Sequence, residues 1–461
     1  MRKISVIVVI LFFYLLILPL KKDGSSASEG DTSTRVLLTL EECIKRSLTI
    51  SPEIQEKEYD VEIARAKIKE VSANRFPQLT FIGMVGPAPK ARGDQIDSPD
   101  SVTELHGLTD FERIDINMVQ PLYTFGKITS GLKAATHGVN AKKAMVTQEE
   151  TDIVLKTKEY YYGLLLAREI REIILNVKED FDIAKDKIND LLEKGSENVD
   201  EADLHKLDTY YGEVEGHLQE VEKSIELAHS ALRMHVGLSN DIDFDIAETS
   251  LKQVDREIGE ISLHIEKAKE MRPEFTQIKE GLLAHESLVK VAKSDYYPSI
   301  FLGGLLSYAN SSGRTRIKNP YINDEFNHLY GGVVVGAKWD IDFGITKAKV
   351  ESAFAEELKL TKTMDFAEAG IPLQVKKAYL EAVEAKENII STERSYKSAK
   401  KWLVIAVANF DMGIGPAKEI FEALSAYAKM NVEYFKSIYN YNMALANLSH
   451  VTGEDCEEIR R

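Results

Sequence analysis

The stretch QPLYTFGKITSGLKAA, from Gln120 to Ala135, contains a proline, two aromatic residues and two glycines where an alternating pattern changes to a helical one. A similar junction, KWDIDFGITKAKVESA, runs from Lys338 to Ala353. Before the first junction, RIDINMVQ alternates apolar and polar side chains, which is typical of a strand with one apolar face. Both junctions therefore predict a strand that passes directly into a helix, and their recurrence indicates an internal repeat.

Further residue pairs recur along the chain at nearly the same spacing. Two landmarks return 221 residues later: Pro52 as Pro273 (273 − 52) and Pro77 as Pro298 (298 − 77). Two more return 218 residues later: Phe125-Gly126 as Phe343-Gly344 (343 − 125) and Gly195 as Gly413 (413 − 195). We therefore expect two tandem structural repeats, residues 37–240 and 261–455, joined by an acidic linker at residues 241–260. A solenoid would need more copies.

Each repeat is expected to contain two strands, at about residues 78–86 and 113–123 in the first and about residues 299–309 and 330–340 in the second. They have the length of tilted membrane-spanning strands, although a half-buried soluble sheet would give the same alternation. The connection within each strand pair is long and polar, which favours the exterior side of an outer-membrane barrel.

The strand ends that face the helices carry aromatic, proline and glycine residues. Proline is tolerated where a strand ladder ends, and glycine allows the turn into the helix. Aromatic rings at one level indicate a membrane-interface belt, with packing in a protein core as the alternative. The residues assigned to the junctions and the belt are Pro77, Tyr123, Phe125, Gly126, Pro298, Trp339, Phe343 and Gly344.

A helical pattern of unusual length follows each junction. As one helix, residues 127–193 would extend about 100 Å, which is too long for a compact domain. Apolar side chains alternate spacings of three and four along it, as in a coiled coil. The second copy is expected to break near Pro372. Gly195 and Gly413 then mark the tips of two helical hairpins.

The composition limits the class of protein. The 461 residues carry a net charge of −16 and only short basic runs, which argues against a nucleic-acid partner. Residues 1–27 are predicted to be a signal peptide, with an uncleaved membrane anchor as the alternative. Cys43 and Cys456 are too few for a disulfide scaffold, and the sequence leaves their redox state open.

The sequence lacks the usual signals of an enzyme. It has no G-x-S-x-G, H-E-x-x-H, Walker or C-x-x-C motif, and its 10 histidines have no metal-ligand spacing. Asp340 and Asp342 would lie on one face of a strand, where lining a pore or capping the junction is the expected role. We therefore expect no catalytic site, no cofactor and no metal.

Four membrane strands in one chain would leave two open sheet edges. Unpaired backbone groups are costly in hydrocarbon, so the chain must oligomerise to close a barrel. Strands pooled from several identical subunits and continued by long helices would enclose a tube. A tube implies transport.

Over nearly the whole mature chain, the sequence resembles the TolC-like outer-membrane efflux proteins, also called outer membrane factors. The resemblance rests on LTLEECIKRSLTISPEI near the start, QPLYTFGKI at the first junction, the late segment beginning FDMGIGPAKEIFEALSAYAKMNVEYF, and the duplicated layout. It implies a mainly α fold with a small β part. Three copies would form a homotrimer, with a 12-stranded β-barrel in outer-membrane lipid that continues as an α-helical barrel in the periplasm.

The same resemblance implies a function and partners. The trimer would export substrates across the periplasm and the outer membrane of a double-membraned bacterium, with type I secretion among the possible routes. It would work with a periplasmic adaptor and an inner-membrane transporter of the RND, ABC or MFS class, which supplies the energy. Conduction would be passive and gated at the periplasmic tip, and the linker at residues 241–260 would lie in the periplasmic equatorial region.

In this family, acidic residues just beyond the second hairpin tip narrow and charge the entrance. Glu419 and Glu422 match these positions, and Glu201 takes the corresponding place in the first repeat. Threefold symmetry would turn them into carboxylate rings that attract cations, with an ordinary solvated acidic face as the alternative.

The tips near Gly195 and Gly413 are expected to contact the adaptor. Two positions depart from the family pattern: Gly415 replaces a basic residue that helps to latch the closed state in some members, and Phe410 replaces a tyrosine. We therefore expect closure by side-chain packing, or a less tightly shut resting pore.

A coiled-coil scaffold or adhesin of the cell surface or periplasm, without a pore, is the alternative function. It would explain the heptads and the charge. It would leave the duplicated strand pairs and their aromatic ends unexplained.

Overall fold

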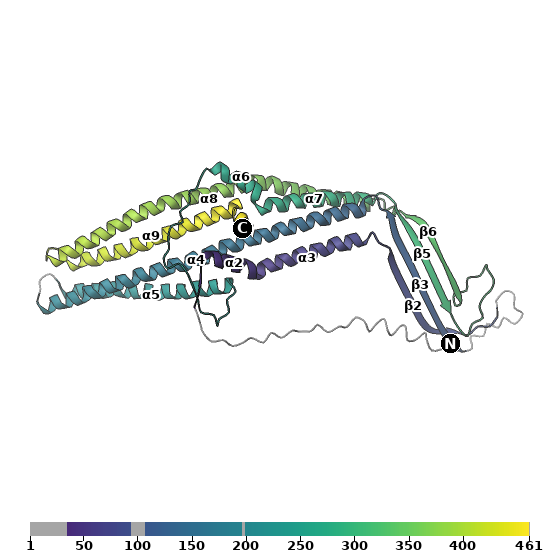
Figure 1. Ribbon diagram of the computed structural model, residues 1–461, viewed down its shortest axis with the longest axis horizontal. Coiled ribbons are helices and arrows are strands. Elements are labelled where there is room, and N and C mark those ends of the chain that lie inside the picture. The colour runs from purple at the N-terminus through teal and green to yellow at the C-terminus, as the bar shows by residue number, and fades with distance from the viewer. Residues whose placement is uncertain (1–34, 94–106, 196–198, 461) are drawn as a thin grey trace.

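The computed structural model describes residues 35–93, 107–195 and 199–460. Long helices lie along the long axis of the molecule, and one small sheet extends from an end of the helices (Figure 1). The fold is therefore mainly α with a small β part. The expected signal peptide, residues 1–27, lies outside the described residues.

Each repeat contributes the same order of elements: two helices, a strand pair and a long helical hairpin. In the first repeat these are α2 (Leu40–Ile50), α3 (Pro52–Ala73), β2 (Gln78–Pro89), β3 (Leu108–Tyr123), α4 (Lys127–Glu193) and α5 (Glu201–His235). In the second they are α6 (Ile261–Met271), α7 (Pro273–Ser294), β5 (Ser299–Asn310), β6 (His328–Lys338), α8 (Ile345–Asp411) and α9 (Ala417–Thr452). The remaining elements are β1 (Val36–Leu38), β4 (Phe244–Ile246) and α10 (Asp455–Arg460).

Local signals in the sequence set the starts of the first helices. Thr39 caps α2: its hydroxyl accepts a hydrogen bond from the Glu42 N–H at 3.2 Å, and the Glu42 carboxylate accepts one from the Thr39 N–H at 2.8 Å. Pro52 is the first residue of α3, where a missing N–H leaves no helical bond unmade. Both helix starts are therefore set by residues next to them in the chain.

The four long strands form one antiparallel sheet in the order β2-β3-β5-β6. In its register Met118 lies opposite Leu79 and Gly304, and Gly304 lies opposite Val333, so one row of residues shares a face. The next row on that face contains Phe81, Ile116, Leu306 and Gly331. That face is therefore apolar. The opposite face carries polar residues, among them Thr80, Asn117, Asp115 and Ser307.

The strand ends differ from those expected. β2 extends to Pro89 and β3 begins at Leu108, so the first hairpin reaches farther into the polar connection. β6 ends at Lys338, and Trp339 therefore lies beyond the strand instead of within it. Lys338 pairs with Ser299, so the next partner in register would be Pro298, which has no N–H to continue the ladder.

α8 is continuous over 67 residues, so the predicted break near Pro372 is wrong. Pro372 lies inside the helix. Its neighbours Ile371 and Val375 are buried in an apolar cluster with Ala268 of α6 and Phe275 of α7. Packing on this face holds the helix together across the hydrogen bond that proline cannot make.

The acidic linker at residues 241–260 is part of the main core. It contains β4, which pairs in parallel with β1, with Val36 opposite Phe244 and Leu38 opposite Ile246. Phe244, Leu251 and Ile258 are buried in one cluster with side chains of α4, α8 and α9. Because these linker positions are widely spaced, no period in the sequence marked them as a core segment.

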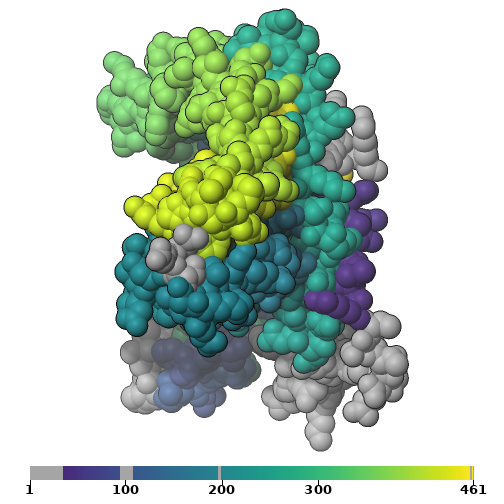
Figure 2. All heavy atoms as spheres, turned by 90° about the vertical axis from the view of Figure 1, so that its left-hand side faces the viewer, coloured from purple at the N-terminus to yellow at the C-terminus, as the bar shows by residue number. Residues whose placement is uncertain are grey.

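The two helical hairpins pack side by side. α4 packs on α5, α8 packs on α9, and α4 also packs on α9, so α4 and α9 form the centre of the four-helix layer. Seen from the hairpin ends, both hairpins lie against each other (Figure 2). A second apolar cluster, here called the tip cluster, joins them: Phe181 and Ile188 of α4, Leu207 of α5, Phe410 of α8, and Phe421 of α9.

Candidate functional site

The hairpin tips lie at the end of the molecule opposite the sheet (Figure 1). Gly413 has a φ of 71°, and the Ile414 N–H donates to the Asn409 carbonyl at 3.0 Å, which closes α8 in a Schellman turn. Gly195 has a φ of 67° at the end of α4. Positive φ at both positions explains why glycine occurs at both tips.

Gly415 and Phe410 hold the second tip together. A Cβ on Gly415 would lie 2.9 Å from the Asn409 Cβ, so the turn has no room for a larger residue. The Phe410 ring is buried in the tip cluster. The second tip is therefore packed by apolar contact and close backbone approach.

Lys187 links the two hairpins at this end. Its ammonium group makes an ion pair with the Asp411 carboxylate, which crosses from α4 to α8. It also lies 5.5 Å from the centre of the Phe410 ring, within cation–π distance. No motif in the sequence indicated this contact, because its partners are 224 residues apart.

The predicted acidic residues lie near the starts of the two return helices, with Glu201 and Glu419 in the first turns. Glu201 is the exposed first residue of α5, just after the capping Asp200. Glu419 is half-buried in the first turn of α9, and Glu422 is exposed and pairs with Lys418 at 3.3 Å. Carboxylates near a helix start also stabilise the helix, because they interact favourably with the positive end of its dipole. The rings stay a prediction.

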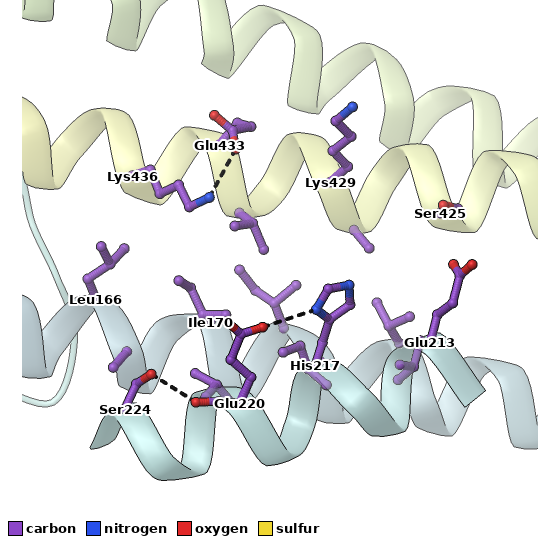
Figure 3. Close-up of a pocket in the computed structure, with 18 of the residues that line it drawn as sticks. Leu166, Ile170, Glu213, His217, Glu220, Ser224, Ser425, Lys429, Glu433 and Lys436 are labelled. Atoms are coloured by element: carbon purple, nitrogen blue, oxygen red, sulfur yellow. Dashed lines mark hydrogen bonds and ion pairs between the residues drawn. The ribbon is translucent and has the colours of Figure 1, made fainter. Parts of the chain in front are cut away.

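A groove of about 730 Å³ lies above the tips, between α5 and α9 (Figure 3). Its floor is the apolar face of α4, with Leu166, Ile170, Ile174 and Val177. Glu213, His217 and Glu220 of α5 face Lys429, Glu433 and Lys436 of α9 across it. An apolar floor between charged walls suits an amphipathic helix. The heptad pattern predicted the apolar floor, but the sequence could not place α5 and α9 on its two sides.

The polar face of the sheet carries a hydrogen-bonded network near the polar loops. Ser307 Oγ lies 2.5 Å from Asp115 Oδ1 and 2.8 Å from His328 Nε2. Arg113 Nε lies 2.9 Å from Asp115 Oδ2. The network ties β3, β5 and β6 together, and it puts charged groups on the face opposite the apolar one.

The two strand-to-helix junctions have the same unusual backbone. Phe125 and Phe343 have φ values of 47° and 48°, and each is followed by a glycine with positive φ. Asp342 caps α8: its carboxylate accepts from the Thr346 hydroxyl at 2.6 Å and the Thr346 N–H at 2.9 Å. These bonds lower the pKa of Asp342. Asp342 therefore caps the junction, which is one of the two roles expected for it. The prediction that Asp340 and Asp342 lie on a strand is wrong, because β6 ends at Lys338.

The outer membrane efflux protein family model matches residues 43–198 and 264–454, which is most of the chain. The chain belongs to the outer membrane efflux protein family. The two matched segments fall on the two repeats and leave out residues 199–263, which contain α5 and the linker. This outer membrane efflux protein is a protein of the outer membrane that extends into the periplasm, and its general function is efflux through an outer-membrane channel.

Solved outer-membrane channels share the fold of this efflux protein. It is similar to VceC of Vibrio cholerae (TM-score 0.74, 16% identity, 90% of this chain and 96% of that chain covered). It is also similar to CmeC of Campylobacter jejuni (TM-score 0.73, 17% identity, 95% of this chain and 94% of that chain covered). A third similar structure is the open state of MtrE of Neisseria gonorrhoeae (TM-score 0.72, 14% identity, 95% of this chain and 98% of that chain covered). No curated protein sequence matches the chain.

Other site types can be assessed in the described part of this efflux protein. Within residues 35–93, 107–195 and 199–460, no three or more His, Cys, Asp or Glu side chains are placed to hold a metal ion. No described helix is both long and apolar enough to cross a membrane. Cys43 and Cys456 are both buried, and Cys43 is a free thiol, so the two cysteines are not joined to each other.

Proposed function

We propose that three copies of this efflux protein form a passive channel-tunnel, with a 12-stranded barrel in the outer membrane and a helical barrel in the periplasm. The observation that carries the proposal is the unfinished sheet. In the described chain, β2 and β6 each pair on one side only, and the apolar face is bare. Val85, for example, is 89% exposed. Open edges and apolar side chains are both satisfied when copies close a barrel in lipid.

The polar face of the sheet would line the pore. Closing the sheet puts one face toward lipid and the other toward the interior. The apolar rows with Met118 and Val333 suit lipid, and the Arg113–Asp115–Ser307–His328 network suits a water-filled interior. The junction aromatics, including Tyr123 and Trp339, are exposed and would lie at the periplasmic membrane interface.

The partners would be a periplasmic adaptor and an inner-membrane transporter of the RND, ABC or MFS class. The adaptor would dock at the tips near Gly195 and Gly413 and in the groove above them. A helix from the adaptor could place apolar side chains on Ile170 and Ile174 and charged side chains against Glu220 and Lys429. The transporter would supply the energy, since the channel itself conducts passively.

Gating would take place at the same tips. The Lys187–Asp411 ion pair and the packed Phe410 hold the two hairpins of one protomer together. Opening would require the hairpins to separate. Glu419, Glu422 and Glu201 would then set the charge of the entrance.

Two measurements on the protein purified in detergent test this function. Light scattering should give a mass of three chains, and insertion into planar bilayers should give discrete single-channel currents. A monomer without channel activity would refute the proposal. A detergent-stable trimer without conductance would support the pore-free scaffold instead.

A further inference from the structure

We propose that neighbouring subunits meet in the same way as the two repeats meet within one chain, with Val335 opposite Val85 and Phe343 stacked on Phe76 of the next copy. The inference rests on the proposed assembly and adds its register and contacts. The partner is a second copy of this chain, because the chain already contains the interface once.

The internal interface between the repeats is well defined. β3 of the first repeat pairs with β5 of the second, with Ile116 opposite Leu306. Where these strands enter the helices, the Phe125 ring stacks on the Tyr297 ring, with centroids 4.9 Å apart and planes 10° apart. Strand pairing and an aromatic stack therefore mark this interface.

The hairpin registers give the equivalence of the repeats residue by residue. Gln78 pairs with Val119 in the first hairpin, and Ser299 pairs with Lys338 in the second. β2 therefore maps onto β5 with a shift of 221 residues (299 − 78), and β3 maps onto β6 with a shift of 219 (338 − 119). After the irregularity between Pro121 and Tyr123 the shift is 218, because β3 contains one additional residue there.

This equivalence predicts the interface that each protomer lacks. β6 corresponds to β3, and β2 corresponds to β5, so β6 of one copy should pair with β2 of the next. The pair equivalent to Ile116 and Leu306 is then Val335 and Val85 (116 + 219 and 306 − 221). Val335 and Val85 lie on the same apolar face, because they share it with Val333 and Leu79. The predicted register therefore keeps the apolar face continuous.

At the open edges, the residues equivalent to the two stacked rings are aromatic as well, but they are exposed. The equivalent of Phe125 is Phe343 (125 + 218), and the equivalent of Tyr297 is Phe76 (297 − 221). The Phe343 side chain is 100% exposed although its φ is 48°, and Phe76 is 65% exposed. A bulky residue held at positive φ needs compensating contacts. Phe125 has them, and Phe343 would obtain them from the neighbouring Phe76.

The helices carry an independent sign of the same contact. In the internal interface, Glu280 of α7 lies 2.8 Å from His137 Nδ1 and 3.0 Å from Asn140 Nδ2 of α4. The equivalent of Glu280 is Tyr59 in α3 (280 − 221), which is 70% exposed.

The two polar partners of Glu280, like Glu280 itself, have less polar equivalents at the open edges. The equivalents of His137 and Asn140 are Ala355 and Leu358 in α8 (137 + 218 and 140 + 218), and both are exposed. All three polar positions of the internal contact are thus replaced by apolar or aromatic residues at the open edges. Such a joint change is expected if Tyr59 packs on Ala355 and Leu358 of a neighbour.

Disulfide cross-linking tests the register. Opposed residues in an antiparallel pair have Cα atoms about 4.5–5.5 Å apart, within disulfide range. The double variant Val85→Cys/Val335→Cys should give cross-linked dimers and trimers on a non-reducing gel after mild oxidation. The matched control Ile116→Cys/Leu306→Cys should form the same bond within one chain and run as a monomer.

Register-shifted variants make the result decisive. Replacing Val85→Cys by Gly83→Cys or Pro87→Cys moves the partner by two residues on the same face. Cross-linking of Val335→Cys to either of these instead of to position 85 would overturn the proposed register. It would leave the trimeric channel intact, which light scattering and conductance report separately.

A rescue experiment tests the helix contact in a chain without added cysteines. Tyr59→Glu should lower the temperature at which the trimer dissociates, because it puts a carboxylate against apolar residues. Adding Ala355→His and Leu358→Asn rebuilds the Glu280 arrangement between subunits and should restore that temperature. Failure of the triple variant to recover while Tyr59→Glu alone is harmful would contradict this contact.

Discussion

Lys187 of α4 makes an ion pair with Asp411 of α8 and holds its ammonium 5.5 Å from the Phe410 ring. This contact joins the two hairpins of one protomer at their tips. It lies at the same tip as Gly415 and Phe410, the two positions where the resemblance implies a different latch. The chain therefore has a polar connection between the hairpins, built from residues other than those the resemblance pointed to.

Removing this connection should favour the open channel. An exposed ion pair contributes about 0.2–1 kcal/mol, which shifts an equilibrium by up to about fivefold. Lys187→Ala should therefore raise the open probability of single channels in planar bilayers. Lys194→Ala is the matched control, since Lys194 pairs with Asp190 of its own helix and links no hairpins. Equal effects of both variants would contradict a latch at Lys187.

The acidic residues beyond the second tip should control ion selectivity. Glu419→Gln/Glu422→Gln should reduce the preference for cations, seen as a smaller reversal potential in a salt gradient. Lys418→Gln should act in the opposite direction, because Lys418 neutralises Glu422 at 3.3 Å. If selectivity stays unchanged in both variants, the carboxylates belong to a solvated face and not to the entrance.

Gly415 should resist substitution by any residue that has a side chain. A Cβ would lie 2.9 Å from the Asn409 Cβ, so Gly415→Ala should cost about 1–3 kcal/mol of unfolding free energy through overcrowding. Gly216→Ala in α5 is the control: its Cβ would meet nothing within 4 Å, so it should stabilise the helix by about 0.5–1 kcal/mol. Denaturant unfolding measures both, and a neutral Gly415→Ala would refute the crowding argument.

Glu280 should make stability depend on pH. Burial raises the pKa of its carboxyl, but hydrogen bonds from His137 and Asn140 outweigh burial and lower the pKa below the ordinary 4.5. A lowered pKa means that the ionised group stabilises the fold above pH 4.5 and that this contribution is lost as the pH falls further.

Glu280→Gln should therefore lower the melting temperature at pH 7 and bring it closer to that of the wild type below the ordinary pKa. Glu266→Gln, on an exposed position of α6, serves as the control and should change little. A difference between Glu280→Gln and the wild type that does not vary with pH would speak against an ionised, hydrogen-bonded Glu280.

Cys43 should be inert in the folded protein. Burial, followed by the nearby Glu248 and Glu42 carboxylates, raises the pKa of its thiol to about 12, so almost no thiolate exists at neutral pH. A maleimide should modify it only after unfolding, as mass spectrometry would show. Rapid labelling of Cys43 in the native trimer would contradict its buried position.

Much of the architecture followed from patterns in the sequence. The duplicated glycines marked both hairpin tips, since Gly195 and Gly413 have positive φ. The alternation around Met118 gave the apolar face of the sheet, and Thr39 and Pro52 gave helix starts. These features are local, so the residues that form them are neighbours in the chain.

Other features depended on how distant segments pack. The helix continues through Pro372 because Ile371 and Val375 are buried against α6 and α7. The linker joins the core because Phe244 lies beside Val36 in a parallel pair. Neither contact has a period or a motif, so the sequence alone gave no sign of them.

The sequence by itself determined the repeat, the order of strands and long helices, and the glycine tips, because local spacing and backbone preference specify them. Only the tertiary structure decided the groove between α5 and α9, the Lys187–Asp411 link and the strand register. Those features arise where segments more than 100 residues apart in the sequence meet, and packing sets their geometry. The register of β3 with β5 is also what turned a repeat in the sequence into a specific prediction for the interface between subunits.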